Sequence, residues 1–271
     1  MTNTDTDKVF AGTIPAIYDR LMGPLLFQPY AEDMARRVAA LAPQRILETA
    51  AGTGIVTGAM ASILPAGTAI TATDLNPAML AIAAAHRAAP NVTWQQGDAT
   101  RLSFAEDAFD AVVCQFGVMF FPDKLAAYRE ARRLLRPGGT LLFNVWDSLE
   151  ENELPKIVSQ AVAAAFPDDP PGFFARTPHG YFNADAIRSS LLAAGFTAIN
   201  FETVRLRSMA ATARDAATGF CQGTPLRNEI EQRDAGRLAA VTEAAAMAVA
   251  ARFGADAIDV PMQAKVFSAI A

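Results

Sequence analysis

The stretch "RILETAAGTG" (residues 45–54) decides the fold that this sequence predicts. The apolar strand "RILET" carries one carboxylate, Glu48, and runs into five residues with almost no side-chain bulk. The helical pattern "IVTGAMASILP" follows at once and ends at Pro65. A loop this bare is either a tight turn or a place where a ligand approaches the backbone, because glycine has no Cβ atom. Strand, loop and helix in this order predict a βαβ unit.

Strands and helices alternate over the next hundred residues. The strand patterns "AITATD", "VTWQQGDA", "FDAVVCQFG" and "TLLFNVWD" are separated by helical patterns, of which "DKLAAYREARRLLRPGG" is expected to end at Gly138 and Gly139. "TAINFETVRLRS" and "MQAKVFSAIA" complete seven strands. We therefore predict an α/β fold with a Rossmann-like, doubly wound, mostly parallel seven-stranded sheet and helical cap insertions.

Three parts are expected along the chain. Residues 1–44 form N-terminal helices, and residues 45–147 form the core of the sheet. Residues 148–271 form the C-terminal half of the sheet, with a helix capped by Asn183 and two long helical stretches between residues 213 and 253 as cap material.

Composition excludes several classes of protein. The 271 residues are 52% hydrophobic with a formal charge of −5, so no basic surface argues for nucleic acid. Cys114 and Cys221 make neither a metal nor a disulfide pattern, which favours a reducing cytoplasm. The polar start "MTNTDTDK" is unlike a signal peptide, and the most apolar stretch is too short to span a bilayer. We expect a cytoplasmic protein without membrane, nucleic-acid or metal partners; the oligomeric state stays open, with a homodimer as one option.

Carboxylates lie at the ends of three successive strands: Glu48, Asp74 and Asp98. Asp74 follows Gly54 by twenty residues, the spacing at which a carboxylate binds a ribose diol. Taken singly, the loop is a tight turn, or Asp74 caps the helix that begins near Asn76. Together, the three acids predict a ligand site at the carboxyl edge of the sheet.

A nicotinamide dinucleotide is the first candidate ligand for this site. Its fingerprint G-x-G-x-x-G requires a third glycine where this chain has Thr57, and Gly58 comes one place late. A pyrophosphate would also meet like charge at Glu48. A ligand with a cationic end fits better. Adenosine joined to methionine, with a sulfonium and an ammonium, suits all three acidic positions.

The ordered set "ILETAAGTG", "ATDLNPAML", "QQGDATRLSF", "FDAVVCQFGVMFFPD" and "LRPGGTLLF" resembles the class I S-adenosylmethionine-dependent methyltransferases, in the small-molecule group that includes ubiquinone- and menaquinone-pathway enzymes. The resemblance covers residues 10–147 well and the remainder only in topology. It implies S-adenosylmethionine as the cofactor. One departure is Ala50, where the family usually has glycine, and we expect slightly altered loop geometry there.

The resemblance also implies roles for individual residues around the methionyl group. Glu48 and the backbone of Ala50 and Gly52 would face it. Gln115 would lie near its ammonium, with Phe116 beside it.

The resemblance further implies residues for the nucleoside. Asp74 would hold both ribose hydroxyls, with Leu75 against the adenine face. Asp98 would accept from the adenine amino group, and the Ala99 amide would approach the ring. Tyr18, in the N-terminal helices, would cover the cofactor. The implied cofactor residues are Tyr18, Glu48, Ala50, Gly52, Gly54, Asp74, Leu75, Asp98, Ala99, Gln115 and Phe116.

The part of the chain that follows the fifth strand contains two candidate general bases. His179 lies in "ARTPHGYF", near where family substrates bind, and Asp147 follows the strand directly. A plain loop histidine is the alternative for His179, since methyl transfer by in-line displacement does not always need a base.

Aromatic residues gather in "FGVMFF", "NVW" and "PDDPPGFFARTPHGYF". About half should be core. The last segment is too irregular to be wholly buried backbone, so we expect its aromatic side chains to be exposed as walls of an apolar pocket. The predicted substrate-pocket residues are Met119, Trp146, Phe173, Phe174 and Tyr181.

The sequence thus predicts a methyltransferase that acts on an O, N or C atom of a medium-sized, largely apolar small molecule. Two alternatives remain. One is a non-catalytic protein that binds S-adenosylmethionine or S-adenosylhomocysteine. The other is a different alkyl transferase that uses the same sulfonium, such as an aminopropyl transferase.

Overall fold

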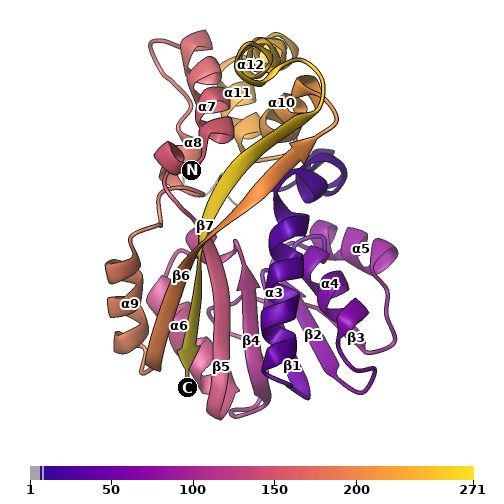
Figure 1. Cartoon of the computed structure of the whole chain (residues 1–271), viewed down its shortest axis with the longest axis vertical. Coiled ribbons are helices and arrows are strands. Elements are labelled where there is room, and N and C mark those ends of the chain that lie inside the picture. The colour runs from indigo at the N-terminus through magenta and orange to yellow at the C-terminus, as the bar shows by residue number, and fades with distance from the viewer. Residues whose placement is uncertain (1–6, 8) are drawn as a thin grey trace. The chain divides into compact units, whose positions relative to one another are not determined.

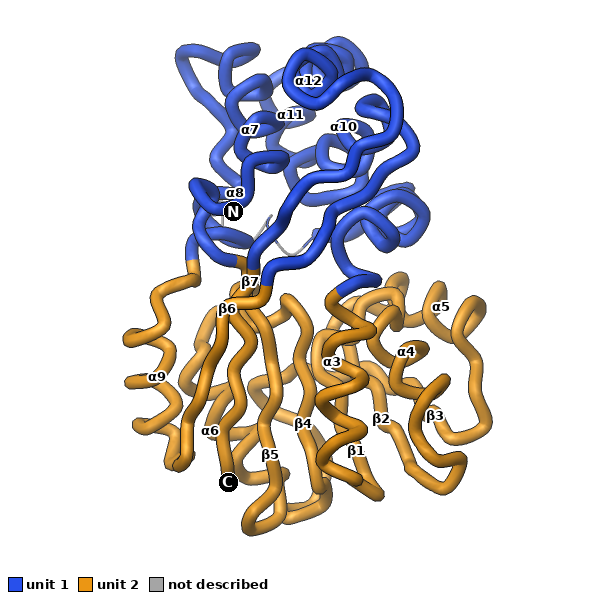
Figure 2. The backbone as a smooth tube through the Cα atoms, in the orientation of Figure 1, with its two compact units in different colours: residues 1–29, 147–180, 205–263 blue, residues 30–146, 181–204, 264–271 orange. Residues whose placement is uncertain are grey.

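The computed structural model describes residues 7 and 9–271, which form two compact units (Figure 2). The residue ranges of unit 1 are 1–29, 147–180 and 205–263, and those of unit 2 are 30–146, 181–204 and 264–271. Neither unit is continuous in sequence, so the compact units do not coincide with the three parts expected along the chain. The functional division into three parts stays a prediction.

A seven-stranded sheet has the order β3-β2-β1-β4-β5-β7-β6 (Figure 1). Its strands are β1 (Arg45–Thr49), β2 (Ala69–Asp74), β3 (Val92–Gln96), β4 (Phe109–Gln115), β5 (Leu135–Trp146), β6 (Thr197–Ala210) and β7 (Ile258–Ile270). Strands β1 to β5 pair in parallel, and β7 runs antiparallel to β5. The predicted mostly parallel Rossmann-like sheet is confirmed. Its order reverses between β1 and β4, and ligands of open α/β sheets bind at such a switch point.

Helices cover both faces of the sheet in unit 2. They are α3 (Gln28–Ala40), α4 (Ile55–Ile63), α5 (Pro77–His86), η2 (Val118–Phe120), α6 (Lys124–Leu134) and α9 (Ala184–Ala193). Tyr30 of α3 packs edge-on against Trp146 at 5.4 Å between ring centroids, whereas Tyr128 of α6 packs on Phe143 at 5.5 Å. Because Phe143 and Trp146 lie three residues apart on one strand, they point to opposite faces. Helices α3 and α6 therefore lie on opposite sides of the sheet.

The end of α6 differs from the prediction. The helix ends at Leu134, five residues before the predicted end at Gly139. Strand β5 begins at Leu135. Pro137 explains the early end, because the residue before a proline is disfavoured in helical conformation. Gly138 has a φ of 78° and lies within β5, so it does not cap the helix.

Unit 1 is mostly helical. Its elements are α2 (Ile14–Ile17), η1 (Tyr18–Phe27), η3 (Leu149–Glu151), α7 (Glu153–Ala165), α8 (Phe173–Arg176), α10 (Ala213–Gln222), α11 (Leu226–Asp234), η4 (Ala235–Arg237) and α12 (Leu238–Phe253). The first of the two helical stretches predicted between residues 213 and 253 is interrupted after Gln222, and Pro225 precedes the next helix. Helix η1 contains Pro24 and is a π-helix, because the Gln28 N–H bonds to the carbonyl of Gly23 five residues earlier.

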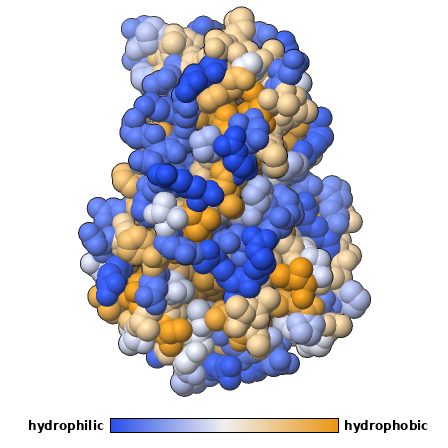
Figure 3. Space-filling view, viewed as in Figure 1, coloured by the Kyte–Doolittle hydropathy of each residue, from blue (hydrophilic) through white to orange (hydrophobic). Residues whose placement is uncertain are grey.

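Hydrophilic side chains are interspersed with smaller hydrophobic groups on the face shown in Figure 3. Among the described residues, no helix combines the length and the apolar composition that crossing a membrane requires.

Candidate active site

The bare loop between β1 and α4 has an unusual backbone. Ala50, Gly52 and Gly54 have φ angles of 53°, 57° and 79°. This left-handed region favours glycine, because a Cβ atom crowds the backbone there. Ala50 therefore adopts the conformation that suits the glycine usual in the family. Its Cβ atom also faces Gly117, where an added Cβ would lie only 2.5 Å away.

The two glycines of the loop serve different purposes. A Cβ atom on Gly54 would lie 2.5 Å from the Trp94 ring, so packing against β3 requires glycine there. A Cβ atom on Gly52 would meet nothing within 4 Å among the described residues. The open space beside Gly52 is therefore where a ligand can approach the backbone.

Glu48 is a buried acid, 1% exposed. Its Oε2 accepts a hydrogen bond from Thr57 Oγ1 at 2.5 Å. Burial raises the pKa of Glu48 to about 8; the Thr57 hydrogen bond opposes the rise and the nearby Asp74 adds to it. No lysine, arginine or histidine of residues 7 and 9–271 forms an ion pair with Glu48. A cationic ligand would supply the positive charge that the described surroundings of Glu48 lack.

Asp74 joins the loops after β1 and β2. Its Oδ2 accepts from the Gly52 N–H at 2.7 Å, and its Oδ1 accepts from the Asn76 N–H at 2.8 Å. Burial raises its pKa, while these backbone hydrogen bonds lower it. Asn76, which accepts from Ala78 N at 2.9 Å, is itself the cap of α5. Asp74 is thus available for another task, since each carboxylate oxygen has a second lone pair for a hydroxyl donor.

The residues predicted for adenine are more exposed. Leu75 is 56% exposed. Asp98 lies on the surface two residues beyond β3, and its Oδ1 accepts from the Thr100 N–H and hydroxyl at 2.8 and 2.7 Å. Ala99, which lies between Asp98 and Thr100 in the sequence, is half-buried. The roles of these residues toward adenine stay predictions.

At the end of β4, Gln115 is half-buried and Phe116 has a φ of 51°. Phe116 stacks on Trp146 with ring centroids 3.8 Å apart, and its N–H donates to Asn144 Oδ1 at 2.9 Å. Asn144 was missed by the sequence reasoning, although a polar residue inside the apolar run "TLLFNVW" was a usable indication. It holds the strained turn that follows Gln115.

Within unit 2, the predicted pocket residues are partly core. Met119 and Trp146 are 4% and 6% exposed. Tyr181 is half-buried, and its hydroxyl lies 3.3 Å from that of Tyr128. Lys124 lies over the Tyr181 ring, with its Nζ 4.9 Å from the centroid.

Within unit 1, the expected exposure of Phe173 and Phe174 is wrong. They are 1% and 5% exposed, because the short helix α8 turns both side chains inward. Phe174 packs edge-on against Phe220 at 5.4 Å. Their role in substrate binding stays a prediction.

The two candidate bases lie together in unit 1. His179 Nδ1 is 2.7 Å from the backbone carbonyl oxygen of Asp147. Burial lowers the pKa of His179 to about 4, so the ring is neutral near pH 7. The Asp147 carboxylate accepts from Gln263 Nε2 and from the Ser148 N–H, both at 2.8 Å. A carbonyl only accepts, so Nδ1 carries the proton and Nε2 carries the lone pair.

Tyr18 also belongs to unit 1, where it opens η1. Its ring stacks on Phe27 with centroids 4.8 Å apart. The predicted cover over the cofactor stays a prediction.

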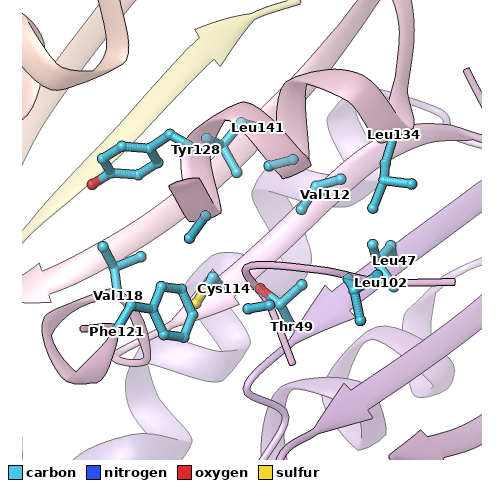
Figure 4. Close-up of a pocket in the computed structure, with 13 residues that line it drawn as sticks. Leu47, Thr49, Leu102, Val112, Cys114, Val118, Phe121, Tyr128, Leu134 and Leu141 are labelled. Carbon is cyan, nitrogen blue, oxygen red and sulfur yellow. The ribbon is translucent and has the colours of Figure 1, made fainter. Parts of the chain in front are cut away.

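A small internal cavity of about 20 Å³ lies under α6 (Figure 4). Thr49 and Cys114 line it, together with apolar residues such as Leu141. Thr49 follows Glu48 on β1, so the two side chains point to opposite faces. The cavity therefore lies on the α6 face of β1, and Ala99, which is predicted to approach the adenine, also lines it.

Comparisons with known proteins identify relatives of this chain. Residues 47–143 match the family described as a methyltransferase domain. The demethylmenaquinone methyltransferase of Chlorobaculum parvum is 31% identical over 169 residues, 58% of this chain and 67% of that protein. The corresponding enzyme of Mycolicibacterium paratuberculosis is 44% identical over 99 residues, 36% of this chain and 40% of that protein. The chain spans only about two fifths of the length of several such relatives.

A solved structure shares the fold. Phosphoethanolamine N-methyltransferase 2 of Haemonchus contortus, in complex with phosphomonomethylethanolamine and S-adenosylhomocysteine, superposes with a TM-score of 0.60 at 19% identity, covering 100% of this chain and 60% of that one. The matched family segment contains both acids, Glu48 and Asp74. The chain belongs to the class I S-adenosylmethionine-dependent methyltransferases.

Proposed function

We propose that the protein transfers a methyl group from S-adenosylmethionine to an O, N or C atom of a medium-sized, largely apolar small molecule. The observation that carries this proposal is the pair of acids, buried Glu48 and half-buried Asp74, beside the open space at Gly52. Relatives named demethylmenaquinone methyltransferase favour a quinone-type ring as the acceptor.

The residues present fit this cofactor. Glu48 would face the cationic methionyl end, and Asp74 would accept from the two ribose hydroxyls. The open space at Gly52 admits the ligand to the loop backbone. Gln115 and Phe116 would line the methionyl end, and Leu75 with Asp98 and Ala99 the adenine. When bound, the sulfonium supplies an activated methyl group.

The protein's own contribution is alignment. Methyl transfer breaks the sulfur–carbon bond as the bond to the acceptor forms in line, so holding both partners in a water-poor site supplies much of the acceleration. Where the acceptor must lose a proton, His179 is the better candidate base. Burial lowers the pKa of His179 to about 4 and keeps its ring neutral near pH 7, whereas the Asp147 carboxylate accepts two hydrogen bonds.

Asp74→Ala tests the cofactor site by calorimetric titration with S-adenosylhomocysteine. We expect affinity to fall by about 1–3 kcal/mol, because charge-assisted hydrogen bonds to the ribose are lost. Asp185→Ala is the matched control, since it removes one exposed carboxylate from the first turn of α9. Equal affinities in the two variants would remove Asp74 from the site.

Turnover separates an enzyme from a binding protein. The wild-type protein is incubated with S-adenosylmethionine and either reduced naphthoquinones or small cationic amines, and S-adenosylhomocysteine release is measured. We expect S-adenosylhomocysteine to be released with the reduced naphthoquinones and not with the cationic amines. Tight binding without turnover on any acceptor would favour the non-catalytic alternative.

A further inference from the structure

Glu48 and Thr57 form a pair that the family assignment leaves unexplained. Thr57 lies in the first turn of α4, three residues after Gly54, and is fully buried. Its hydroxyl donates to Oε2 of Glu48 at 2.5 Å. Because Oε2 accepts this bond, a proton on the Glu48 carboxyl belongs on Oε1.

The described groups near Glu48 include no cation, and the Thr57 hydrogen bond only partly offsets the rise in its pKa that burial and Asp74 cause. Asp74 on β2 and Cys114 on β4 interact with it electrostatically, and α4 contributes the uncharged Thr57. No cation of the described residues pairs with it. With a pKa of about 8, the carboxyl keeps its proton at neutral pH until a positive charge arrives.

We propose that cofactor binding drives a proton from Glu48 into solvent, and that Thr57 is the positioning residue that holds the carboxylate so formed. The inference rests on the proposed function. The O–H bond of Glu48 breaks, the buffer takes the proton, and the cationic methionyl end compensates the new negative charge. Thr57 is already a donor to the carboxyl, so its bond strengthens as the charge develops.

Proton release is measured by calorimetric titration with S-adenosylmethionine in buffers of different ionisation enthalpy. At pH 7 we expect about 0.9 proton per cofactor, the protonated fraction for a pKa of about 8. Affinity should rise about tenfold per pH unit between pH 5.5 and 7. The range stops at pH 7 because the cofactor's own α-amino group titrates near pH 8.

Glu48→Gln keeps the shape and an acceptor oxygen but has no proton to lose. We expect proton release to fall to near zero and the pH slope to flatten. Thr57→Val should weaken binding about 10- to 100-fold at pH 7, and Thr57→Ser should restore it, because only the hydroxyl matters.

Thr73→Val is the matched control. Thr73 is buried, and its hydroxyl donates to the backbone carbonyl of Glu48 at 2.9 Å, away from the carboxyl. This variant should keep the wild-type proton count and pH slope. If Thr57→Val and Thr73→Val weakened cofactor binding equally, Thr57 would have only a structural role, and its proposed role as the positioning residue for Glu48 would be overturned.

The wild-type measurement decides the main point without any variant. Binding that releases fewer than about 0.2 protons at pH 7, or a Glu48→Gln protein that releases as many as wild type, would overturn the inference. A wild-type protein that binds neither S-adenosylmethionine nor S-adenosylhomocysteine would instead contradict the proposed function.

Discussion

Each unit buries a carboxylate that accepts a hydrogen bond from a threonine hydroxyl. The two carboxylates differ in whether a cation lies beside them. In unit 2, Thr57 donates to Glu48, and no cation of the described residues joins them. In unit 1, Thr177 donates to Asp7, which also accepts from Arg176 Nε at 3.1 Å and from its Nη2 at 2.5 Å.

The unit 1 cluster is completed by its own residues. Arg176 also pairs with Glu229, whose other oxygen accepts from the Gly172 N–H at 2.9 Å. Burial alone would lower the pKa of Arg176, but its hydrogen bonds to Asp7 and Glu229 raise it. The two clusters therefore differ in charge compensation: the buried acids of unit 1 have their own arginine, whereas Glu48 has no cation among the described residues, and our proposal is that the cofactor supplies it.

Breaking the unit 1 cluster should have the largest effect. Arg176→Met leaves the carboxylates of Asp7 and Glu229 buried without their cation, so we expect a loss of about 3 kcal/mol in the free energy of unfolding, measured in urea. Arg214→Met is the control, because Arg214 and Glu243 form an exposed pair whose removal should cost under about 1 kcal/mol. Equal losses would show that the buried cluster is no more important than a surface pair.

The second prediction concerns stability against pH in unit 2. The folded protein keeps the Glu48 proton up to a pKa of about 8, whereas the unfolded chain releases it near 4.5. The unfolded state therefore binds fewer protons between these values, and stability falls as pH rises, by roughly 1 kcal/mol per unit.

Glu48→Gln should abolish that slope, so the measured quantity is the difference in unfolding free energy between wild type and variant at several pH values. The difference is needed because His179, whose pKa is lowered to about 4, contributes a slope of opposite sign below its ordinary pKa of 6.5. A wild-type curve parallel to that of Glu48→Gln from pH 5 to 8 would contradict the raised pKa of Glu48.

The smallest effect is expected from Thr177→Val, which sharpens the comparison with Thr57→Val. Asp7 keeps its bonds to Arg176, so the loss should be about 1 kcal/mol in the free energy of unfolding. Affinity for S-adenosylhomocysteine should stay at the wild-type value. A large loss of affinity here would mean that the two threonine–carboxylate pairs do not differ in function.

Periodicity predicted the core of unit 2 well. Strand ends are local features, so the alternation of strands and helices was enough to put Glu48 and Asp74 at one edge of the sheet. Thr57 appeared in the sequence only as a missing third glycine. Its contact with Glu48 depends on how α4 packs against β1, which no local pattern reports.

Unit 1 was less predictable because its contacts are distant in sequence. Asp7 and Glu229 meet through Arg176, and no spacing rule connects such positions. The burial of Phe173 and Phe174 was missed for the same reason, since the partner of Phe174 is Phe220. Composition indicated an irregular segment but not which way its rings turn.

The division of the chain into units has a consequence for biosynthesis. The chain passes between the units five times, after residues 29, 146, 180, 204 and 263. Unit 1 needs residues up to 263, and unit 2 needs residues 264–271 for the end of β7. Neither unit can finish folding while the ribosome is still making the first 260 residues. The two units are therefore completed within a few residues of each other, and no single cut in this part of the chain separates one unit from the other.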